Sequence, residues 1–460
     1  MRKESEAKAV NLGEGSIGKL MWKLALPTII AQMVNLLYNL IDRIYIGHIP
    51  GTGDIALTGL GLCFPIIMLI TAFSSLIGFG GAPRVAIFMG KGDMKTAEKI
   101  VGNCVAALVF LSIILTVVLE LTGTPILKLF GASENTLPYA LSYLRIYVFG
   151  TLFVMVAVGL NPFITTQGFT RESMKMVVIG AVCNIILDPI FIFLFHMGVQ
   201  GAALATIISQ AISAFFILRF LLSDKSKIKI LKQNLRIQPA IILPVMALGI
   251  SPFVMSATES LLNVAFNSSL AKYGGDEAVG AMTILSSIMQ LQMLPVQGLT
   301  QGAQPIISFN YGAMKVERVK KAFRLLILVC VIYTTIFWLA VQLAPELFVK
   351  IFNNNSPELI ATTAWAIRIY FAVSFTFGIL VSVQQTFMAL GQAKISLLIA
   401  CLRKVILLIP LIYILPNFLE NKTFAVFLAE PVADFLSISV ALILFITNIN
   451  KILSKAGDVK

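Results

Sequence analysis

Long apolar segments recur along this chain, and each is long enough to cross a lipid bilayer. A span needs about 20 apolar residues at a rise of about 1.5 Å per residue. Backbone groups in a bilayer are satisfied only in helices and closed barrels, and continuous apolar runs of this length indicate helices. We therefore expect an all-α integral membrane protein with twelve transmembrane helices. The predicted spans are residues 24–48, 57–82, 100–121, 138–160, 174–196, 200–222, 243–271, 277–305, 325–344, 358–386, 395–416 and 422–447.

The composition excludes a soluble domain. Hydrophobic residues make up 58% of the 460 residues and charged residues only 12%, whereas soluble domains carry about 25% charged residues. A soluble chain of this kind would expose large apolar patches. The net charge of +13 does not indicate nucleic acid as a partner, because the basic residues lie between the apolar segments. We expect membrane lipids to surround the protein, which we predict to be a monomer.

Lys and Arg residues fall mainly on one side of the predicted spans. With the N-terminal tail in the cytoplasm, the C-terminal tail and the central linker also lie on the cytoplasmic side. These segments hold many of the 35 basic residues. Loops with an excess of Lys and Arg stay on that side of the membrane. We therefore predict a multi-pass protein of the plasma (inner) membrane with both termini cytoplasmic.

Short motifs of the first half return in the second half at a nearly constant distance. Residues 53–56 (GDIA) correspond to 275–278 (GDEA), and residues 92–95 (GDMK) correspond to 312–315 (GAMK). Six spans in each half bring both halves into the membrane from the same side. The sequence therefore predicts two pseudo-symmetric six-helix bundles, related by an axis along the membrane normal.

The repeat also divides the chain into domains. A cleft between two such lobes is a natural place for a substrate and for a rocking motion, and this architecture is typical of transporters. The predicted parts are an N-terminal tail (1–23), a first lobe (24–222), a cytoplasmic linker (223–242), a second lobe (243–447) and a C-terminal tail (448–460).

The first predicted span carries polar residues on one face. Asn35, Tyr38 and Asp42 are spaced i, i+3, i+7 and so share one side of a helix. A carboxylate at the centre of a span costs about 2.5–3.5 kcal/mol on insertion scales, and less near the interface. This face should therefore look at a cavity or at another helix. We predict that this helix is the moving, ion-sensing element of a transporter.

A second group of polar residues lies in the fifth and sixth predicted spans. Asn184 and Asp188 share a face at i, i+4, Pro189 disturbs the helix beside them, and Thr206 follows in the next span. With Asp42 they offer oxygen ligands suited to Na⁺, and two carboxylates buried together can instead hold a proton. The residues do not choose between Na⁺ and H⁺. The alternatives are structural: an ion pair of Asp42 with Arg43 or Arg145, and an Asp-Pro corner at Asp188.

The second lobe has its own charged residues. Glu430 and Asp434 are spaced i, i+4 in the last span, and Arg403 and Lys404 lie at a compatible depth in the preceding one. Mutual pairing is the simplest interpretation. Glu259 in the seventh span shows no partner in the sequence, so it is either a cavity-facing carboxylate or a locally hydrogen-bonded one. It is a candidate site for a cationic substrate.

Methionines are candidates for an adaptable substrate cavity, because their side chains repack around different ligands. Simple filling of the membrane helices is the alternative interpretation. No catalytic motif, such as a P-loop or HExxH, is present, so we predict that the protein is not an enzyme and needs no cofactor beyond the coupling ion. The candidate methionines are Met33, Met155, Met255, Met289 and Met293.

Three stretches carry a resemblance to a known family. They are PTIIAQMVNLLYNLIDRIYIG in the first span, NIILDPIF in the fifth and QGAQPIISFNYGA in the eighth. Together with two repeated six-span lobes, they resemble the MATE (multidrug and toxic compound extrusion) family, and in particular its MepA/DinF-like prokaryotic branch. The resemblance covers the chain from about residue 18 to 449.

The resemblance implies export of lipophilic, often cationic compounds in exchange for H⁺ or Na⁺ by alternating access. It implies a cation site in the first lobe at Asp42, Asn184, Asp188 and Thr206. Family substrate-cavity positions fall near Asn35, Tyr38 and Asn161. Another MATE branch uses a second-lobe carboxylate in the tenth span, where this chain has Gln384 and Gln385. This departure speaks against ion coupling in the second lobe.

The resemblance also suggests a mechanism and leaves alternatives. A cation arriving from outside would neutralise the carboxylates, reposition the first helix and lower the affinity for bound drug. A flippase for lipids or lipid-linked oligosaccharides, or a metabolite exporter, of the same superfamily would share the two-lobed plan. A flippase would show a strongly basic central cavity, whereas the basic residues here lie mostly in the loops.

Overall fold

The structure is a computed structural model that describes residues 9–352 and 356–456; within these ranges it contains helices and no strand. Residues 1–8 of the predicted N-terminal tail and residues 457–460 of the predicted C-terminal tail lie outside the described residues. So does the segment 353–355, which follows the ninth span.

The first lobe runs from α1 to α7. The chain bends by 58° between α4 and α5, which together form one span. A short π-helical segment, η1, follows α6. The bounds are α1 (Ile17–Gly47), α2 (Gly53–Gly90), α3 (Met94–Leu129), α4 (Leu137–Phe149), α5 (Thr151–Thr166), α6 (Thr170–Pro189), η1 (Ile190–Leu194) and α7 (Val199–Leu222).

The second lobe runs from α8 to α15 and follows a linker that contains the 3₁₀ turn η2 (Lys232–Asn234). The chain bends by 52° between α11 and the segment 374–389. The bounds are α8 (Pro239–Gly312), α9 (Val316–Leu343), α10 (Pro345–Lys350), α11 (Pro357–Tyr370), η3 (Ser374–Thr376), α12 (Phe377–Ala389), α13 (Ala393–Cys401), η4 (Leu402–Leu408), α14 (Ile409–Ile414), η5 (Leu415–Asn417) and α15 (Lys422–Leu453).

The helices account for the twelve predicted spans. Within the described ranges, nine helices are long and apolar enough to cross a membrane when α8 is counted once. α8 contains two spans, because the backbone of Gly275 is non-helical (φ 64°, ψ −164°). Each of the two bent pairs adds one more span. The prediction of a twelve-span, all-α membrane protein is therefore confirmed.

Several spans are longer than predicted, because the helices continue past the apolar segments. α1 begins at Ile17, before the predicted start at residue 24, and α15 continues to Leu453. α8 begins at Pro239, inside the predicted linker 223–242. Proline is favoured in the first turn of a helix, where no backbone donor is needed. The connection between the lobes is accordingly shorter than the sequence suggested and ends at Gln238.

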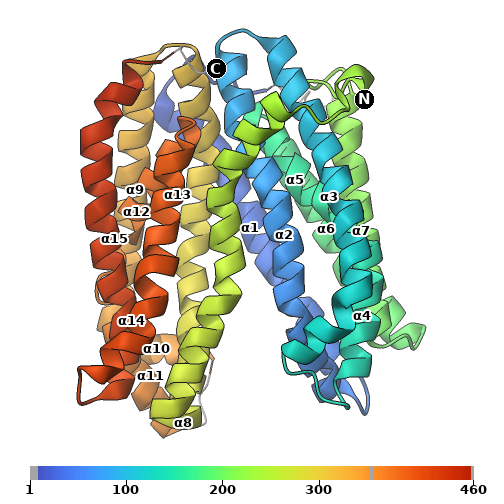
Figure 1. Cartoon of the computed structure of the whole chain (residues 1–460), viewed down its shortest axis with the longest axis vertical. Helices are drawn as coiled ribbons and strands as arrows, with labels where there is room; N and C mark the ends of the chain where they lie inside the picture. The colour runs from blue at the N-terminus through green and yellow to red at the C-terminus, as the bar shows by residue number, and fades with distance from the viewer. Residues whose placement is uncertain (1–8, 353–355, 457–460) are drawn as a thin grey trace, which may run out of the picture.

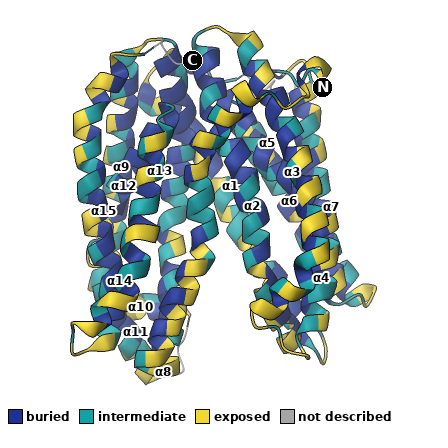
Figure 2. Cartoon of the chain, viewed as in Figure 1, coloured by how far each residue is buried: buried dark blue, intermediate teal, exposed yellow. Residues whose placement is uncertain are grey.

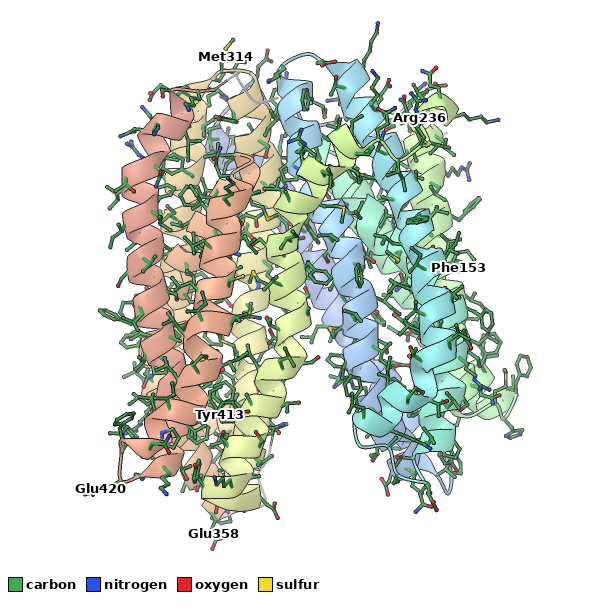
Figure 3. All side chains as sticks on the ribbon, viewed as in Figure 1. Phe153, Arg236, Met314, Glu358, Tyr413 and Glu420 are labelled. Atoms are coloured by element: carbon green, nitrogen blue, oxygen red, sulfur yellow. The ribbon has the colours of Figure 1, made fainter. Side chains whose placement is uncertain are left out.

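Both ends of the described chain lie at one end of the molecule, together with Arg236 and Met314 (Figures 1 and 3). We call this the terminal end. Glu358 and Glu420 lie at the opposite end (Figure 3). The two bundles are close together at the terminal end and diverge towards the opposite end, which we call the open end (Figure 1).

The outer faces of the bundles are apolar. Exposed residues follow the outer sides of α7 and α15 along much of their length (Figure 2). They include Phe215 on α7 and Ile443 and Ile446 on α15. Apolar side chains of this kind face lipid at no cost, whereas in water they would form a large exposed patch. The chain is a multi-pass membrane protein.

The first span of each lobe packs partly into the other lobe. The beginning of α1, including Leu20 and Leu24, belongs to a core formed mainly by α8, α9, α12 and α15. The beginning of α8, including Ile242 and Val245, belongs to the core of the first lobe. The two lobes are thus held together at the terminal end by a reciprocal exchange of helix ends, which the predicted division at residues 24–222 and 243–447 did not include.

Glycines allow the backbones of the two lobes to touch. A Cβ atom added to Gly90 would lie 2.0 Å from the carbonyl oxygen of Phe309, and one added to Gly312 would lie 1.9 Å from that of Ile87. Gly312 lies 222 residues after Gly90, and Phe309 lies 222 residues after Ile87. The two contacts are therefore equivalent positions of the internal repeat. Small residues at helix crossings permit such close approach in membranes.

We expect Gly249→Ala to destabilise the contact between the lobes. A Cβ atom at this position would lie 1.8 Å from the carbonyl oxygen of Leu76 on α2, and neither backbone can move without displacing its helix. The measurement is thermal unfolding of the purified protein in detergent. Gly61→Ala is the matched control, because nothing lies within 4 Å of a Cβ atom at this α2 position. Equal unfolding temperatures for the two variants would contradict the prediction.

Candidate functional site

A cavity of about 510 Å³ lies between the two lobes. Its walls come from α1, α2, α4, α5, α6 and α7 of the first lobe and from α8 and α12 of the second. Among the described residues that line it there is no Asp, Glu, Lys, Arg or His. The lining is nevertheless polar, because amide side chains recur in it: Gln32, Asn35, Asn39, Asn161, Asn184, Gln210, Gln297, Gln301, Gln304, Gln384 and Gln385.

The amides of the two lobes meet across the cavity. Gln32 of α1 donates to Gln301 of α8 at 3.2 Å. Gln297, Gln301 and Gln304 are spaced i, i+4, i+7 along α8, so one face of this helix presents three carboxamides. The side-chain nitrogen of Gln304 and the side-chain oxygen of Asn161 are buried without a partner among the described residues. The cavity therefore offers hydrogen bonds without formal charge.

The structure brings the four predicted cation-site residues together in the first lobe. The Asn184 amide donates to Asp188 Oδ1 at 3.2 Å and to Thr206 Oγ1 at 3.4 Å. The carboxyl groups of Asp42 on α1 and Asp188 on α6 are near enough to interact electrostatically. All four side chains are buried. We call this group the first-lobe cluster.

Three oxygens of the first-lobe cluster have no hydrogen-bond partner among the described residues. They are Asp42 Oδ1, Asn184 Oδ1 and Asp188 Oδ2. Buried polar atoms are normally satisfied, so oxygens left open on neighbouring side chains fit a cation or a proton as the missing partner. The described residues contain no group of three or more His, Cys, Asp or Glu that could hold a metal. The two carboxylates and the neutral oxygens can hold a hard cation or a proton.

The structural alternatives for Asp42 do not occur. Among the described residues, Asp42 forms no ion pair with Arg43 or with Arg145. The Arg43 guanidinium instead lies over the ring of Phe64, 5.2 Å from its centroid. The Asp42 carboxylate is therefore not held in an ion pair, although the charge of Arg43 still acts on it from a longer distance.

Local helix geometry positions Asp188. The regular part of α6 ends at Pro189, as the sequence predicted, and the chain continues as the π-helical segment η1. Proline removes a backbone donor, and π-helical turns are frequent at functional sites. The break leaves Asp188 at the end of α6, where it faces α1.

The first-lobe cluster lies directly behind the cavity wall. Tyr38, Asn184 and Thr206 line the cavity, whereas Asp42 and Asp188 do not. Asn39 of α1 and Gln210 of α7 line the cavity together with Tyr38. A change in charge at the carboxylates can thus reach the cavity through one layer of side chains.

Comparison with known proteins identifies the family. A family model described as MatE matches residues 27–190 and 252–414. The chain belongs to the MATE family. The two matched segments lie in the two lobes of the repeat, so the family match includes cavity residues of both lobes, while the α7 part of the wall lies outside it.

Individual MATE proteins are similar over almost the whole length. The "Multidrug export protein MepA" of Staphylococcus haemolyticus is 25% identical over 426 residues, which covers 92% of this chain and 93% of that protein. A solved structure of the "MATE multidrug transporter DinF-BH" is 32% identical, with a TM-score of 0.88 over 98% of this chain and 99% of that one. A structure described as an outward-facing MATE family transporter has a TM-score of 0.89 at 21% identity, over 97% of this chain and 99% of that one.

Only some of the substrate-cavity residues predicted for this MATE chain line the cavity. Asn35, Tyr38 and Asn161 line it. Met33, Met289 and Met293 do not: Met33 is exposed on α1, and Met289 packs against the core of the second lobe. Periodicity does not fix the rotation of a helix that is apolar all round, so these methionines were misplaced. Met255 lines the cavity, and Met155 is buried in the first-lobe core.

The glutamine-rich wall was missed from the sequence. Gln384 and Gln385 were noted only as a departure from another MATE branch, and Gln301 and Gln304 only as part of a family motif. The signal was present in the eighth span, where Gln297, Gln301 and Gln304 repeat on one helix face. A row of amides inside an apolar span marks a face that looks at a cavity or at another helix.

The charged residues of the second lobe are paired. Arg403 bonds to Glu430 and to Asp434, as the sequence predicted. The predicted pairing of Lys404 with this carboxylate pair is wrong, because Lys404 forms its ion pair with Glu259. Glu259 therefore has a partner that its sequence did not reveal, and it does not line the cavity.

Proposed function

We propose that this MATE protein is a secondary active multidrug efflux transporter that exports lipophilic, often cationic compounds in exchange for H⁺ or Na⁺. One observation carries the proposal: an uncharged polar cavity between two lobes has two unpaired carboxylates directly behind its wall. The similarity to multidrug export proteins over nearly the full length supports the same conclusion. The proposal includes a single working chain, no cofactor and no enzymatic activity.

The coupling ion is proposed to bind at the first-lobe cluster. A proton shared by Asp42 and Asp188, or a Na⁺ held by their oxygens with Asn184 and Thr206, removes the repulsion between two buried carboxylates. Binding would draw α1 towards α6 and shift Tyr38 in the cavity wall. An ion drives transport only through its different affinity for the two states, so Asp42 and Asp188 must separate, or become hydrated, in the opposite conformation.

Cargo is proposed to bind through hydrogen bonds and apolar contacts. The lining combines carboxamides and hydroxyls with Phe79, Met68, Met255 and Met388. Amides donate and accept, and methionines adapt to different shapes, so one cavity fits many amphiphilic compounds. A delocalised positive charge is acceptable there, because no Lys or Arg lines the described cavity.

The orientation proposed from the charge distribution places the terminal end in the cytoplasm. Basic residues gather on that side in the linker and in the connection after α8, for example at Lys229, Arg236 and Lys315. The bundles diverge towards the other end (Figure 1). The conformation described here is then the one that releases cargo outwards.

The uncharged cavity argues against a flippase for lipid-linked oligosaccharides. A pyrophosphate group needs Arg or Lys as partners, and the described lining contains neither. An exporter of an uncharged or cationic metabolite remains the second candidate, since the amide-rich wall suits such a cargo as well.

Export of ethidium from proteoliposomes tests the proposal. A proton gradient and a sodium gradient are imposed separately on vesicles that contain the purified protein and trapped dye. We expect dye movement under one of the two gradients, which then names the coupling ion. Dye movement under neither gradient would contradict drug antiport and would favour the metabolite exporter.

A further inference from the structure

The second lobe contains five charged side chains within three of its spans. Glu259 lies on the first half of α8, Arg403 and Lys404 lie on η4, and Glu430 and Asp434 lie on α15. All except Glu259 are buried. Charges in a membrane interior are expensive and need partners, so this group has to be accounted for.

Arg403 forms ion pairs with the two carboxylates of α15. Its Nε bonds to Asp434 Oδ1 at 2.6 Å, and its terminal nitrogen bonds to Glu430 Oε1 at 2.6 Å. The guanidinium lies 5.3 Å from the ring centroid of Phe377. A guanidinium between two carboxylates and an aromatic ring is a fixed structural arrangement.

Lys404 forms an ion pair with the carboxylate of α8, Glu259. Its ammonium group donates to the Glu259 carboxylate and, at 2.9 Å, to the backbone carbonyl of Met255. The Lys404 side chain is only 6% exposed, whereas that of Glu259 is 55% exposed. Glu259 therefore does not need Lys404 to compensate for burial. The ammonium is the buried member of the pair, and the oxygens are arranged around it.

The same three spans carry the cation-site candidates in the first lobe. By the repeat, the first half of α8, the α13–η4 segment and α15 correspond to α1, α6 and α7. Gly168 and Gly391, both with positive φ (88° and 74°), lie two residues before the starts of α6 and α13 and mark this correspondence. The first-lobe cluster has carboxylates without a paired cation and oxygens without a partner. In the second-lobe group, Arg403 and Lys404 form ion pairs with the carboxylates.

We propose that the Lys404 ammonium is the resident cation of a second-lobe site for a monovalent cation, formed by the Glu259 carboxylate and the Met255 carbonyl. Removal of the amine opens this site to a small cation from solution. The route exists, because Glu259 lies one helical turn beyond Met255 and Ser256, which line the cavity. Its exposed carboxylate is thus on the side of α8 that faces the space between the lobes.

The resident cation limits where ions are exchanged during transport; this step rests on the proposed function. A tethered cation cannot be exchanged, so the second lobe takes up no ion during the cycle. Ion exchange is then confined to the first-lobe cluster, and the second lobe keeps its internal pairing in both conformations.

Chemical rescue of Lys404→Ala tests the site without any transport assay. The purified variant is unfolded thermally in detergent with added ethylammonium chloride, which replaces the lost amine. Tetramethylammonium chloride and sodium chloride at equal ionic strength are compared. We expect the variant to unfold at a lower temperature than the wild type and to be restored saturably by ethylammonium, because a ligand that binds only the folded state raises its stability. Tetramethylammonium, which has no N–H donor, should not restore it.

Two controls locate the effect. Wild-type protein should not respond specifically to ethylammonium, because its site is filled, and Lys404→Ala/Glu259→Gln should not respond because the carboxylate is gone. Lys404→Ser, which leaves the same space open, is measured in parallel in case Lys404→Ala does not fold, and the same rescue is expected. A folded variant that ethylammonium stabilises no more than tetramethylammonium overturns the proposal. Failure of ethidium export leaves this readout unaffected.

Discussion

Asp42→Asn is expected to reduce gradient-driven export to the level of vesicles without protein. The substitution keeps the shape of the side chain but removes the carboxylate that faces Asp188. Without it, ion binding no longer relieves a repulsion between two buried charges, so the ion loses its preference for one conformation. The measurement is ethidium export from proteoliposomes under the gradient that drives the wild type.

Two comparisons separate loss of coupling from loss of folding or of cargo binding. Asp54→Asn alters an exposed carboxylate at the start of α2 and should leave export unchanged. Binding of ethidium to purified Asp42→Asn in the absence of a gradient should persist, because Asp42 does not line the cavity. If Asp42→Asn retains full coupled export, the first-lobe cluster is not the coupling site.

Arg403→Met is expected to produce the largest loss of stability. The substitution leaves Glu430 and Asp434 buried side by side without their cation. Removal of one partner from a buried ion pair costs about 3–5 kcal/mol, since an uncompensated charge stays behind. The measurement is the thermal unfolding temperature of the purified protein in detergent, which should fall well below that of the wild type.

A triple variant identifies the cause of this loss. Arg403→Met combined with Glu430→Gln and Asp434→Asn removes all three charges, so it should regain a large part of the stability. Arg324→Met on α9 is the surface control, because Arg324 is exposed. An Arg403→Met variant as stable as Arg324→Met would show that the second-lobe ion pairs contribute nothing to the folded state.

The fold was predictable because a bilayer restricts the possible structures so strongly. Continuous apolar segments in lipid must be helical, so their number gives the number of spans. The repeated motifs then fix two lobes in the same orientation, since six spans return the chain to the side where it started. Helix ends were less predictable: α1 and α8 both begin before their apolar segments, where polar residues still satisfy helical hydrogen bonds outside the lipid.

The cation-site candidates could be collected from the sequence for the same reason. Asp42 and Asp188 are carboxylates inside apolar spans, where an ionisable residue is rare and needs a partner. Asn184 shares a helix face with Asp188 by its spacing. Their mutual contact could not be derived, because the distance between α1 and α6 depends on how the whole lobe packs.

The sequence by itself determined the membrane location, the twelve spans, the two repeated lobes and the short list of polar residues buried among them. The tertiary structure alone decided which helix faces meet. It assigned Lys404 to Glu259, placed the glutamines in the cavity wall and kept Met33, Met289 and Met293 out of it. The reason is that span number follows from local hydrophobicity, whereas the rotation of each helix about its axis is set by packing against neighbours distant in the sequence.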